Sequence, residues 1–450
     1  MGNILNNFSR IYFCGILGVS MSGLAKNYAL QGKIVGGSDE NIDVDNSLSI
    51  YGVKVYHGHS EKNVQEFSPD VFVYTSAVKD DNPELLYAKK MGISIFKRSE
   101  VLGHIVSGYP IRIGVSGSHG KTTATAMIAK CLIDGKKSPK VFLGGESLQF
   151  GNFFNGKGQI ALCEACEYNK NFLDIPVNNA VVLNVDNDHK ECYDGETDLI
   201  NTFNEFIKSS VTIVNVDDKN ASRLNLSNAV TFGINSSAVY MAKRIKYNGI
   251  GYSFSVFRNG VAKTRINLCV SGYHNVYNAL SACAVCDMQG VSWRVIKSSL
   301  ESFKGVKRRM ERLGTWNGLD FIADYAHHPN EIKATVHALN EQGEKYLLIF
   351  QPHTYSRTKL LLNEFVDVLS RVENLMVYKT YPARENENQG VNAQTLAKKI
   401  SENIKINVIC AETSAQLHEI LLNKTKGVKK VVFVGAGDIY EIAKKILKNL

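Results

Sequence analysis

The residues Gly114-Val-Ser-Gly-Ser-His-Gly-Lys-Thr-Thr123 have the types and spacing of a phosphate-binding loop. The apolar run before them, residues 109–113, predicts a strand, and residues 124–133 predict a helix. A glycine-rich turn between a strand and a helix leaves backbone N–H groups open to a ligand, and the helix dipole favours an anion there. Lys121 can reach the outer phosphates of a nucleotide, and Thr122 can ligate Mg²⁺. The alternative is a glycine-bearing turn without a ligand.

The loop departs at one position from the general phosphate-loop pattern. That pattern has a glycine five residues before Gly120, where this chain has Val115. We therefore expect a variant of the loop whose phosphate-binding residues, with ATP as the ligand, are Gly114, Val115, Ser116, Gly117, Ser118, His119, Gly120, Lys121, Thr122 and Thr123.

Polar side chains follow two later apolar runs of the same region. Glu164 follows residues 159–163, and a polar segment that ends in His189 follows residues 180–183. Ligands of a parallel α/β sheet lie at the carboxyl ends of its strands, so Glu164 and His189 are expected to meet the Mg²⁺ held by Thr122. For His189 an alternative stays open, in which Asp188 caps a helix and the imidazole is merely exposed.

The first hundred residues predict a sheet of their own. Strands are expected at 11–14, 33–37, 53–56, 71–74 and 93–96, with helical segments between them. The dinucleotide fingerprint fails because position 17 is Leu. Gly15, Gly18 and Gly23 could still form a loop for a nucleotide diphosphate, with Asp39 placed to meet a ribose hydroxyl. Packing glycines are the alternative.

The elements that position these residues predict an α/β protein of three domains, because 450 residues exceed one hydrophobic core. A Rossmann-like domain is expected over 1–107, with the candidate nucleotide-diphosphate loop after its first strand. A central domain over 108–313, of the P-loop ATPase type with a mostly parallel sheet, is expected to bind ATP. A Rossmann-like α/β domain over 314–450 carries apolar runs at 321–323, 347–350 and 430–434, each followed by polar residues.

Composition narrows the class of protein. The apolar fraction of 44% is ordinary for a globular chain, and neither a membrane span nor a signal peptide is visible, so we expect a cytoplasmic protein without membrane insertion. The net charge of +9 could serve nucleic acid or a substrate rich in phosphate and carboxylate. Without an aromatic-interleaved basic stripe, the second interpretation is favoured. The pairs Cys163/Cys166 and Cys283/Cys286 are too far apart for a zinc ribbon, and we interpret them as buried thiols.

Motifs in all three regions resemble the Mur ligase family, whose members form amide bonds with ATP in bacterial cell-wall precursors. The motifs are Gly15…Met21-Ser-Gly-Leu-Ala25, Gly37-Ser-Asp39, Asn82-Pro-Glu84, Gly117–Thr123, Glu164-Ala-Cys-Glu167, Asn184…Asp188-His189, Gly272–Ala279, Val306–Arg309, Asp324–Pro329 and Phe350–Thr358. The chain departs from the family at Leu17 and Ser20, and in having Cys166-Glu-Tyr-Asn169 where Asp-Glu-Ser-Asp is common.

The resemblance implies roles for individual residues. Lys121, Glu164, His327 and Arg357 are expected to be catalytic, and Tyr325, His327 and Arg357 to position the acceptor and the amino acid. Besides the loop, the residues expected to bind ATP are His274, Asn275, Arg309 and Asp324. The residues expected to bind the UDP-sugar are Gly15, Gly18, Met21, Ser22, Gly23, Asp39, Ser76 and Asn82.

The alanine-adding branch of the family fits the third-region motifs best. The resemblance thus implies that L-alanine is joined to the lactyl carboxylate of UDP-N-acetylmuramate through an acyl phosphate, with Mg²⁺ as cofactor and without nucleic acid, by a monomer or weak homodimer. His327 is the expected amine base, and His328 stays open as an alternative. A second alternative is that both histidines are polar loop residues outside the site. Two other functions also stay open: attachment of a whole tripeptide to the same acceptor in murein recycling, and a P-loop switch or nucleic-acid ATPase.

Overall fold

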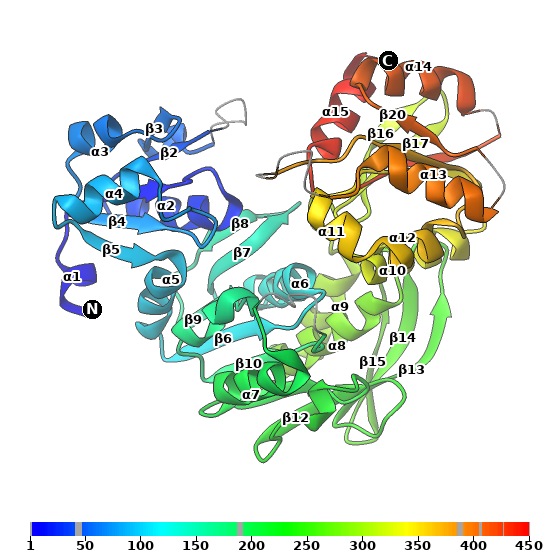
Figure 1. The fold of residues 1–450 in the computed structure, drawn as a ribbon. Coiled ribbons are helices and arrows are strands. Elements are labelled where there is room, and N and C mark those ends of the chain that lie inside the picture. Colours follow the sequence, from blue (N-terminus) through cyan, green and yellow to red (C-terminus); the bar gives the residue numbers. More distant parts are fainter. Residues whose placement is uncertain are drawn as a thin grey trace. The chain divides into compact units, whose positions relative to one another are not determined.

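The computed structural model describes residues 2–40, 47–186, 192–383, 385, 390–404, 407–425 and 427–449. The chain forms three α/β domains, each with its own sheet (Figure 1). It divides into two compact units, the first with residues 1–246, 253–268 and 275–304, and the second with residues 247–252, 269–274 and 305–450. Among the described residues, no helix combines the length and the apolar character needed to span a bilayer.

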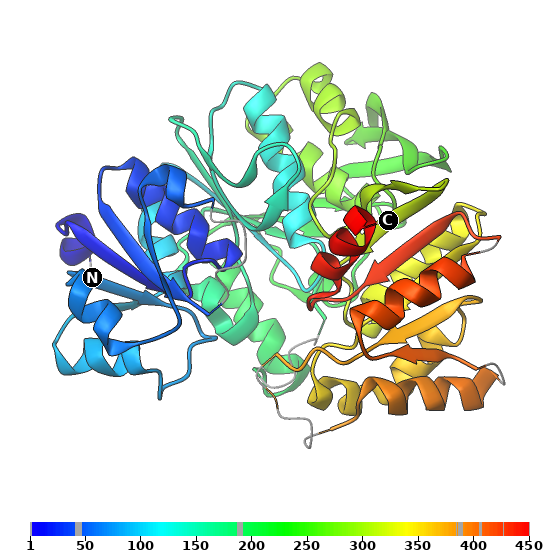
Figure 2. The same ribbon diagram turned by 90° about the horizontal axis from the view of Figure 1, so that it is seen from above.

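The N-terminal sheet has five parallel strands in the order β3-β2-β1-β4-β5. The chain moves outward from β1 to β3 on one side and then to β4 and β5 on the other, so a topological switch point lies between β1 and β4. Both faces are buried, because Ile11 and Phe13 of β1 join one apolar cluster and Tyr12 and Cys14 join another. Figure 2 shows these strands in blue between flanking helices. The elements are α1 (Gly2–Asn6), β1 (Arg10–Cys14), α2 (Val19–Leu30), β2 (Ile34–Asp39), a 3₁₀ turn (Ser49–Tyr51), β3 (Lys54–His57), α3 (Glu61–Phe67), β4 (Val71–Tyr74), α4 (Pro83–Lys90), β5 (Ser94–Lys97) and α5 (Arg98–Ser107).

The central sheet has ten strands in the order β15-β14-β13-β12-β11-β10-β6-β9-β7-β8. The strands from β12 to β7 in this order pair in parallel, whereas β7–β8 and β14–β15 are antiparallel hairpins. Helix α6 is buried along most of its length, as expected for a helix rich in alanine that packs against a sheet. The elements are β6 (Ile111–Ser116), α6 (Lys121–Asp134), β7 (Lys140–Ser147), β8 (Gly151–Asn155), β9 (Ile160–Glu164), β10 (Asn179–Val182), α7 (Gly195–Ile207), β11 (Val211–Asn215), β12 (Ala229–Gly233), β13 (Tyr240–Tyr247), β14 (Tyr252–Arg258), β15 (Val261–Asn267), α8 (His274–Met288), α9 (Trp293–Glu301) and two 3₁₀ segments (Tyr168–Asp174 and Ala221–Arg223).

Helix α2 of the N-terminal domain packs on β7 and β8 of the central sheet, within the same compact unit. Asn152 of β8 donates to Ser22 Oγ at 2.8 Å and accepts from Lys26 Nζ at 2.9 Å. Lys140 of β7 donates to Asn27 Oδ1 at 2.7 Å, and burial lowers the pKa of this lysine. Polar groups therefore connect the two domains where water is excluded, which makes the pairing of helix and hairpin specific.

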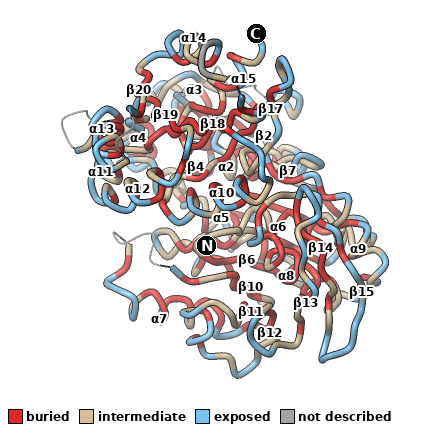
Figure 3. Tube along the Cα trace, turned by 90° about the vertical axis from the view of Figure 1, so that its right-hand side faces the viewer, coloured by how far each residue is buried: buried red, intermediate tan, exposed pale blue. Residues whose placement is uncertain are grey.

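The C-terminal sheet has six strands in the order β16-β17-β21-β18-β19-β20, with β16 antiparallel to β17 and the other neighbours parallel. Its strands are buried on both faces: Leu348 and Phe350 enter one apolar cluster, and Leu347 and Ile349 enter the other. Figure 3 shows the buried residues concentrated on strands such as β4, β6, β10 and β18. The elements are β16 (Glu311–Trp316), β17 (Leu319–Asp324), α10 (Pro329–Glu341), β18 (Tyr346–Phe350), α11 (Tyr355–Leu360), α12 (Leu362–Leu369), β19 (Leu375–Tyr378), α13 (Ala393–Ile404), β20 (Ile409–Ala411), α14 (Ser414–Lys424), β21 (Lys430–Val434) and α15 (Ile439–Asn449).

The predicted fold class is confirmed, and the five N-terminal strands begin and end within about two residues of the expected positions. Two local expectations were wrong. Strand β6 continues through Ser116, so Gly114, Val115 and Ser116 are strand residues rather than loop residues, and α6 begins at Lys121 rather than at residue 124. The boundaries expected at 107/108 and 313/314 remain predictions.

Candidate functional site

The turn between β6 and α6 has the backbone shape that the glycines predicted. Gly117 has φ +136° and Gly120 has φ +85°, conformations that favour glycine. A Cβ on Gly117 would lie 3.0 Å from the carbonyl oxygen of Asn184, and one on Gly120 would lie 2.8 Å from Asn278 Oδ1. A side chain at either glycine would therefore be strained by the backbone conformation and would crowd Asn184 or Asn278.

Asn184, which follows β10, holds the turn in place. Its Oδ1 accepts from the backbone N–H of His119 at 2.8 Å, and its Nδ2 donates to the carbonyl of His119 at 3.0 Å. Ser118 makes a similar pair with the backbone of Asp186, at 2.8 and 2.7 Å. Asn184 and Asp186 both lie in the segment that follows β10, the strand paired with β6, so the turn is anchored to the neighbouring strand's end by four hydrogen bonds.

Thr122 and Glu164 lie together, as the sequence predicted. Thr122, in the first turn of α6, donates from Oγ1 to Glu164 Oε2 at 3.0 Å, and Glu164 ends the neighbouring strand β9. The other carboxylate oxygen of Glu164 accepts from the backbone N–H of Gly144 at 2.6 Å. A hydroxyl and a carboxylate oxygen at the head of a helix are ligand types that Mg²⁺ prefers, so this pair fits that ion.

Lys121 does not extend toward solvent but forms an ion pair with Glu167, a residue to which the sequence analysis gave no role. Lys121 Nζ lies 2.9 Å from Glu167 Oε2 and 3.0 Å from Oε1, and it also donates to the carbonyls of Gly117 and Ser118. Burial opposes the charge on Lys121, but the Glu167 carboxylate outweighs it, so the pKa of the lysine is raised. The lysine is therefore held charged inside the phosphate loop.

Two buried asparagines of α8 are hydrogen-bonded to each other, and one of them lies against the same turn. Asn278 Nδ2 donates to Asn275 Oδ1 at 2.8 Å, and Asn278 faces Gly120. Asn275 was predicted as an adenine contact, whereas Asn184 and Asn278 were not assigned roles. The only sequence signal for Asn184, Asn278 and Glu167 was that they lie within the motifs that carry the family resemblance. The predicted metal ligand His189 lies outside the described residues.

The N-terminal loop after β1 forms a second polar turn at the carboxyl end of a sheet. Gly15 has φ +83°, and its N–H donates to the carbonyl of Ser38 at 2.8 Å. Asp39, which ends β2, accepts from the N–H of Leu17 at 3.0 Å, and Gly18 precedes the first turn of α2. Gly15, Gly18 and Asp39 therefore lie around one turn. Gly23, which was also expected in this loop, lies instead within helix α2, because the helix begins at Val19.

The remaining residues predicted to bind the sugar occupy other environments. Met21 is buried in the apolar core, Ser22 accepts from Asn152, and a Cβ on Gly23 would lie 3.6 Å from Asn152 Nδ2. Asn82 caps α4 by accepting from the N–H groups of Glu84 and Leu85 at 3.0 and 3.1 Å. Ser76 lies exposed in the turn after β4.

In the second unit, the segment around Arg309 packs on the end of β17. Arg309 Nη1 lies 3.7 Å from Glu331 Oε1, and its guanidinium lies over the Tyr325 ring at 5.1 Å. Asp324, at the end of β17, accepts from the N–H groups of Met310 and Ala326 at 2.8 and 2.9 Å. Burial raises the pKa of Asp324 despite the nearby Arg309 charge. His274, the predicted adenine contact that begins α8, also belongs to this unit.

His327 and His328 have different environments. His327 Nδ1 lies 3.1 Å from the carbonyl of Tyr325 and 3.4 Å from Glu331 Oε2. Burial lowers the pKa of His327, and the Arg357 charge lowers it further. His328 instead caps α10, its Nδ1 accepting from the N–H of Asn330 at 3.4 Å. A neutral imidazole is thus available at His327, while one nitrogen of His328 is used in the helix cap.

His353 belongs to the same cluster, although the sequence analysis did not assign it a role. Its ring stacks on Tyr381 with centroids 5.5 Å apart and lies 5.9 Å from the His327 ring. Burial, the neighbouring His327 ring and the Arg357 charge lower the pKa of His353 to about 4. Its Nδ1 has no hydrogen-bond partner among the described residues. One cluster therefore combines two imidazoles with lowered pKa, a guanidinium and a phenol ring, from His327, His353, Arg357 and Tyr325.

The cysteine pairs are free thiols. Cys163, Cys283 and Cys286 are buried and Cys166 is partly buried. Burial raises the pKa of each of the four. These pairs have the properties of packing residues.

Comparisons with known proteins agree with this arrangement. Family models match three consecutive parts of the chain: "Mur ligase family, catalytic domain" over residues 10–110, "Mur ligase middle domain" over 115–286, and "Mur ligase, glutamate ligase domain" over 308–437. The chain is 37% identical to the UDP-N-acetylmuramate–L-alanine ligase of Acetivibrio thermocellus, covering 99% of this chain and 97% of that protein. It is 39% identical to the ligase of the same name from Clostridium acetobutylicum, covering 99% of both.

Two solved structures share the fold over almost the whole chain. The UDP-N-acetylmuramate-alanine ligase of Thermotoga maritima superposes with a TM-score of 0.86 at 28% identity, covering 98% of this chain and 99% of that one. A murein peptide ligase of Psychrobacter arcticus superposes with a TM-score of 0.74 at 21% identity, covering 98% of each chain. At the latter identity the likeness concerns the fold alone.

Proposed function

This chain belongs to the Mur ligase family, and on that premise we propose that it joins L-alanine to UDP-N-acetylmuramate with the consumption of ATP. The observation that carries the proposal is the extent of the likeness. Relatives that bear this activity in their names are 35–39% identical to the chain over 98–99% of its length. A shared fold alone would not choose among amide-forming ligases, because one fold serves several substrates.

The phosphate loop supports activation of a carboxylate by phosphoryl transfer. A carboxylate is a poor acyl donor, so the lactyl carboxylate of the sugar nucleotide first receives the γ-phosphoryl group of ATP. Lys121 neutralises charge on the transferring group, and the clamped backbone of the turn orients it. Thr122 and Glu164 would hold Mg²⁺, which supplies positive charge to the phosphates when bound.

The second unit supports the amide-forming step. The amine of alanine must lose a proton before or as it attacks the acyl phosphate, and phosphate then leaves. His327 is the base in this proposal, because Nδ1–H donates to the Tyr325 carbonyl and the lowered pKa keeps Nε2 unprotonated near neutral pH. Arg357 and Tyr325 orient the acceptor and amino acid, while Arg309 and Asp324 bind ATP, as do His274 and Asn275.

Substrate and location follow from the same proposal. UDP-N-acetylmuramate binds the N-terminal turn formed by Gly15, Gly18 and Asp39, and the chain acts in the cytoplasm, where ATP and free alanine are available. The chain needs no nucleic acid for this reaction and acts as a monomer or weak homodimer.

The test is a phosphate-release assay with UDP-N-acetylmuramate, ATP, Mg²⁺ and a panel of amines. L-alanine should give the highest kcat/KM, above glycine and L-serine, and the product should carry one added alanine by mass. Release with L-alanyl-D-glutamyl-diaminopimelate only would instead identify a recycling ligase. Release without any amine, or stimulation by DNA or RNA, would overturn the proposal in favour of a nucleotide switch or a nucleic-acid ATPase.

A further inference from the structure

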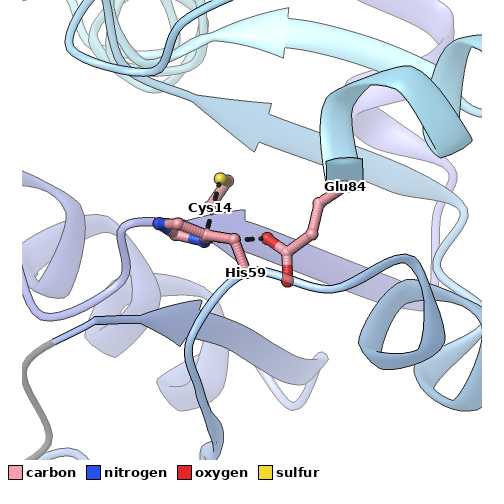
Figure 4. Close-up of side chains that lie close together, drawn as sticks. All are labelled: Cys14, His59 and Glu84. Carbon is pink, nitrogen blue, oxygen red and sulfur yellow. Dashed lines mark hydrogen bonds and ion pairs between the residues drawn. The ribbon is translucent and has the colours of Figure 1, made fainter. Parts of the chain in front are cut away.

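Three side chains with metal-binding atoms converge at the carboxyl end of the N-terminal sheet (Figure 4). Cys14 ends β1, His59 follows β3, and Glu84 lies in the first turn of α4 after β4. The three ligand atoms all lie within 4.8 Å of one another. Cys14 and Glu84 are buried, while the His59 side chain keeps 17% of its surface exposed, which gives the cluster a route to solvent. None of the steps of the proposed ligase reaction uses these three side chains.

The distances between these atoms resemble the edges of a tetrahedral zinc site. Cys14 Sγ lies 3.6 Å from His59 Nδ1, and His59 Nδ1 lies 3.2 Å from Glu84 Oε2. Tetrahedral Zn²⁺ with ordinary bond lengths separates a sulfur and a nitrogen ligand by about 3.6 Å and a nitrogen and an oxygen ligand by about 3.3 Å. Two of the three distances between ligand atoms therefore already match those of a tetrahedral zinc site. The third, from sulfur to carboxylate, is at most 4.8 Å.

Glu84 is oriented for such a site by its other carboxylate oxygen. Oε1 accepts from Tyr12 Oη at 2.8 Å, from Asn63 Nδ2 at 2.9 Å and from the N–H of Ser60 at 3.2 Å. Oε2 faces the His59 ring and also accepts from Ser38 Oγ. Carboxylate ligands of metals are commonly held in this way by a shell of hydrogen-bond donors.

We propose that Cys14, His59 and Glu84 form a binding site for a thiophilic divalent cation, for which Zn²⁺ is the best match. The set of one sulfur, one nitrogen and one oxygen suits Zn²⁺ better than Mg²⁺, which prefers oxygen ligands. Ser38 Oγ lies 2.9 Å from His59 Nδ1, so this hydroxyl or a water completes the tetrahedron. On binding, the Cys14 thiol releases its proton to solvent and the thiolate, the neutral imidazole and the carboxylate bind the cation.

This site is separate from the oxygen-rich pair Thr122 and Glu164. The competing interpretation is a hydrogen-bonded cluster in which His59 and Glu84 form an ion pair beside an inert buried thiol. The two interpretations differ in whether sulfur binds a metal, so a sulfur-sensitive readout separates them. Catalysis is not part of that readout, and the outcome is independent of the proposed ligase function.

The experiment uses the full chain, freed of metal by a chelator, and titrates it with Zn²⁺ against a chromophoric zinc indicator. We expect one tight equivalent per chain, with affinity at least about tenfold weaker in Cys14→Val and in His59→Gln. Val is close to Cys in size and apolar, so it suits the buried position of Cys14. Cys269→Ser, at an exposed cysteine, is the matched control and should bind as the wild type does.

Co²⁺ provides the second measurement, on the unmodified protein. We expect the visible absorption of tetrahedral Co²⁺ together with a near-ultraviolet thiolate charge-transfer band, both of which Zn²⁺ removes. The wild-type spectrum keeps the proposal testable even if Cys14→Val does not fold. Zn²⁺ binding that is equal in Cys14→Val and wild type, absence of a tight equivalent, or a Co²⁺ spectrum without the thiolate band would overturn the proposal.

Discussion

Lys121 Nζ and Glu167 Oε2 lie 2.9 Å apart within the phosphate loop, so the lysine is paired with a carboxylate inside the protein. Only 15% of the Lys121 side chain and 2% of the Glu167 side chain are exposed. An ion pair this far from water is strongly coupled, and removal of one partner leaves the other charge without compensation. A phosphate group that binds Lys121 must therefore either displace the Glu167 carboxylate from the lysine or share the lysine with it.

Replacement of Lys121 should abolish turnover. We expect Lys121→Ala to lower kcat by about 10²–10³-fold or more, because the variant loses a cation aimed at the transferring phosphoryl group. UDP-N-acetylmuramate binding, measured by calorimetry, should remain close to wild type because that ligand is assigned to the N-terminal domain. Lys130→Ala, on the same helix α6, is the control and should keep wild-type turnover. Loss of sugar-nucleotide binding in a folded Lys121→Ala protein would contradict the division of roles between the domains.

Replacement of Glu164 should change the requirement for Mg²⁺. In Glu164→Gln the oxygen that faces Thr122 loses its charge, so we expect the Mg²⁺ concentration for half-maximal rate to rise about tenfold or more. The measurement is phosphate release against free Mg²⁺ at saturating substrates. Glu205→Gln, at an exposed position of α7, should leave the Mg²⁺ dependence unchanged. An unchanged Mg²⁺ dependence in Glu164→Gln, with a reduced maximal rate alone, would remove Glu164 from the metal site.

The pH dependence of the rate should report His327. A base must be unprotonated to accept a proton, and the pKa of His327 is lowered from 6.5 by burial. The rate should therefore be flat from neutral pH down to about 6.5 and fall only below that value. His327→Gln should lower kcat about 10²-fold and remove this acid limb. His328→Gln should keep the limb, and the reverse behaviour of the two variants would move the base to His328.

The stability of the N-terminal domain should depend on pH through His59 and Glu84. The pKa of His59 is raised above 6.5, chiefly by its hydrogen bond to Glu84, so its contribution is complete below pH 6.5 and is lost as pH rises through the folded-state pKa. Burial opposes ionisation of Glu84, but hydrogen bonds from His59 and other donors hold its pKa below 4.5. The contribution of Glu84 is therefore complete above pH 4.5 and is lost as pH falls through its folded-state pKa.

The pair should thus stabilise most between pH 4.5 and 6.5. In that window Glu84→Gln should lower the free energy of unfolding by about 3 kcal/mol, because it leaves His59 without its buried partner. Thermal unfolding in the presence of a chelator, at several pH values, checks this. Glu66→Gln, at the exposed Lys54–Glu66 pair, is the control and should not alter the pH profile. A Tm difference that does not vary with pH would show that the two groups are not linked to folding.

The strand–turn–helix elements could be predicted because their signals are local. The apolar run before Gly114, the glycines and the alanine-rich segment after Thr123 lie within about thirty residues of one another. The signals for the N-terminal strands are local as well, because each strand is a short apolar run of its own. Boundaries were less accurate at β6, whose last residues Gly114 and Ser116 look like loop residues by type but pair with β10. Sheet pairing outweighed local preference there.

The residues that sequence reasoning did not assign are those whose roles depend on distant contacts. Asn184 clamps His119 across 65 positions of chain, and Asn278 comes from a helix more than a hundred residues after the turn. The hairpin β7–β8 was also not predicted, because its strands contain Gly144 and Gly145 and its partner is helix α2. Met21 and Gly23 show the opposite error. They were assigned to a ligand site because they lie in a motif, but they are buried at packing positions.

The polar contacts between α2 and the β7–β8 hairpin have a consequence for the exchange of parts between ligases of this family. A chimaera joined at the end of α5 would take Ser22, Lys26 and Asn27 from one parent and Asn152 and Lys140 from the other. Unless both parents carry matching partners, the junction would bury an unsatisfied amide and a lysine. The segment that must be exchanged as one piece is therefore larger than the N-terminal domain. A chimaera should take residues 140–155 and the N-terminal domain from the same parent.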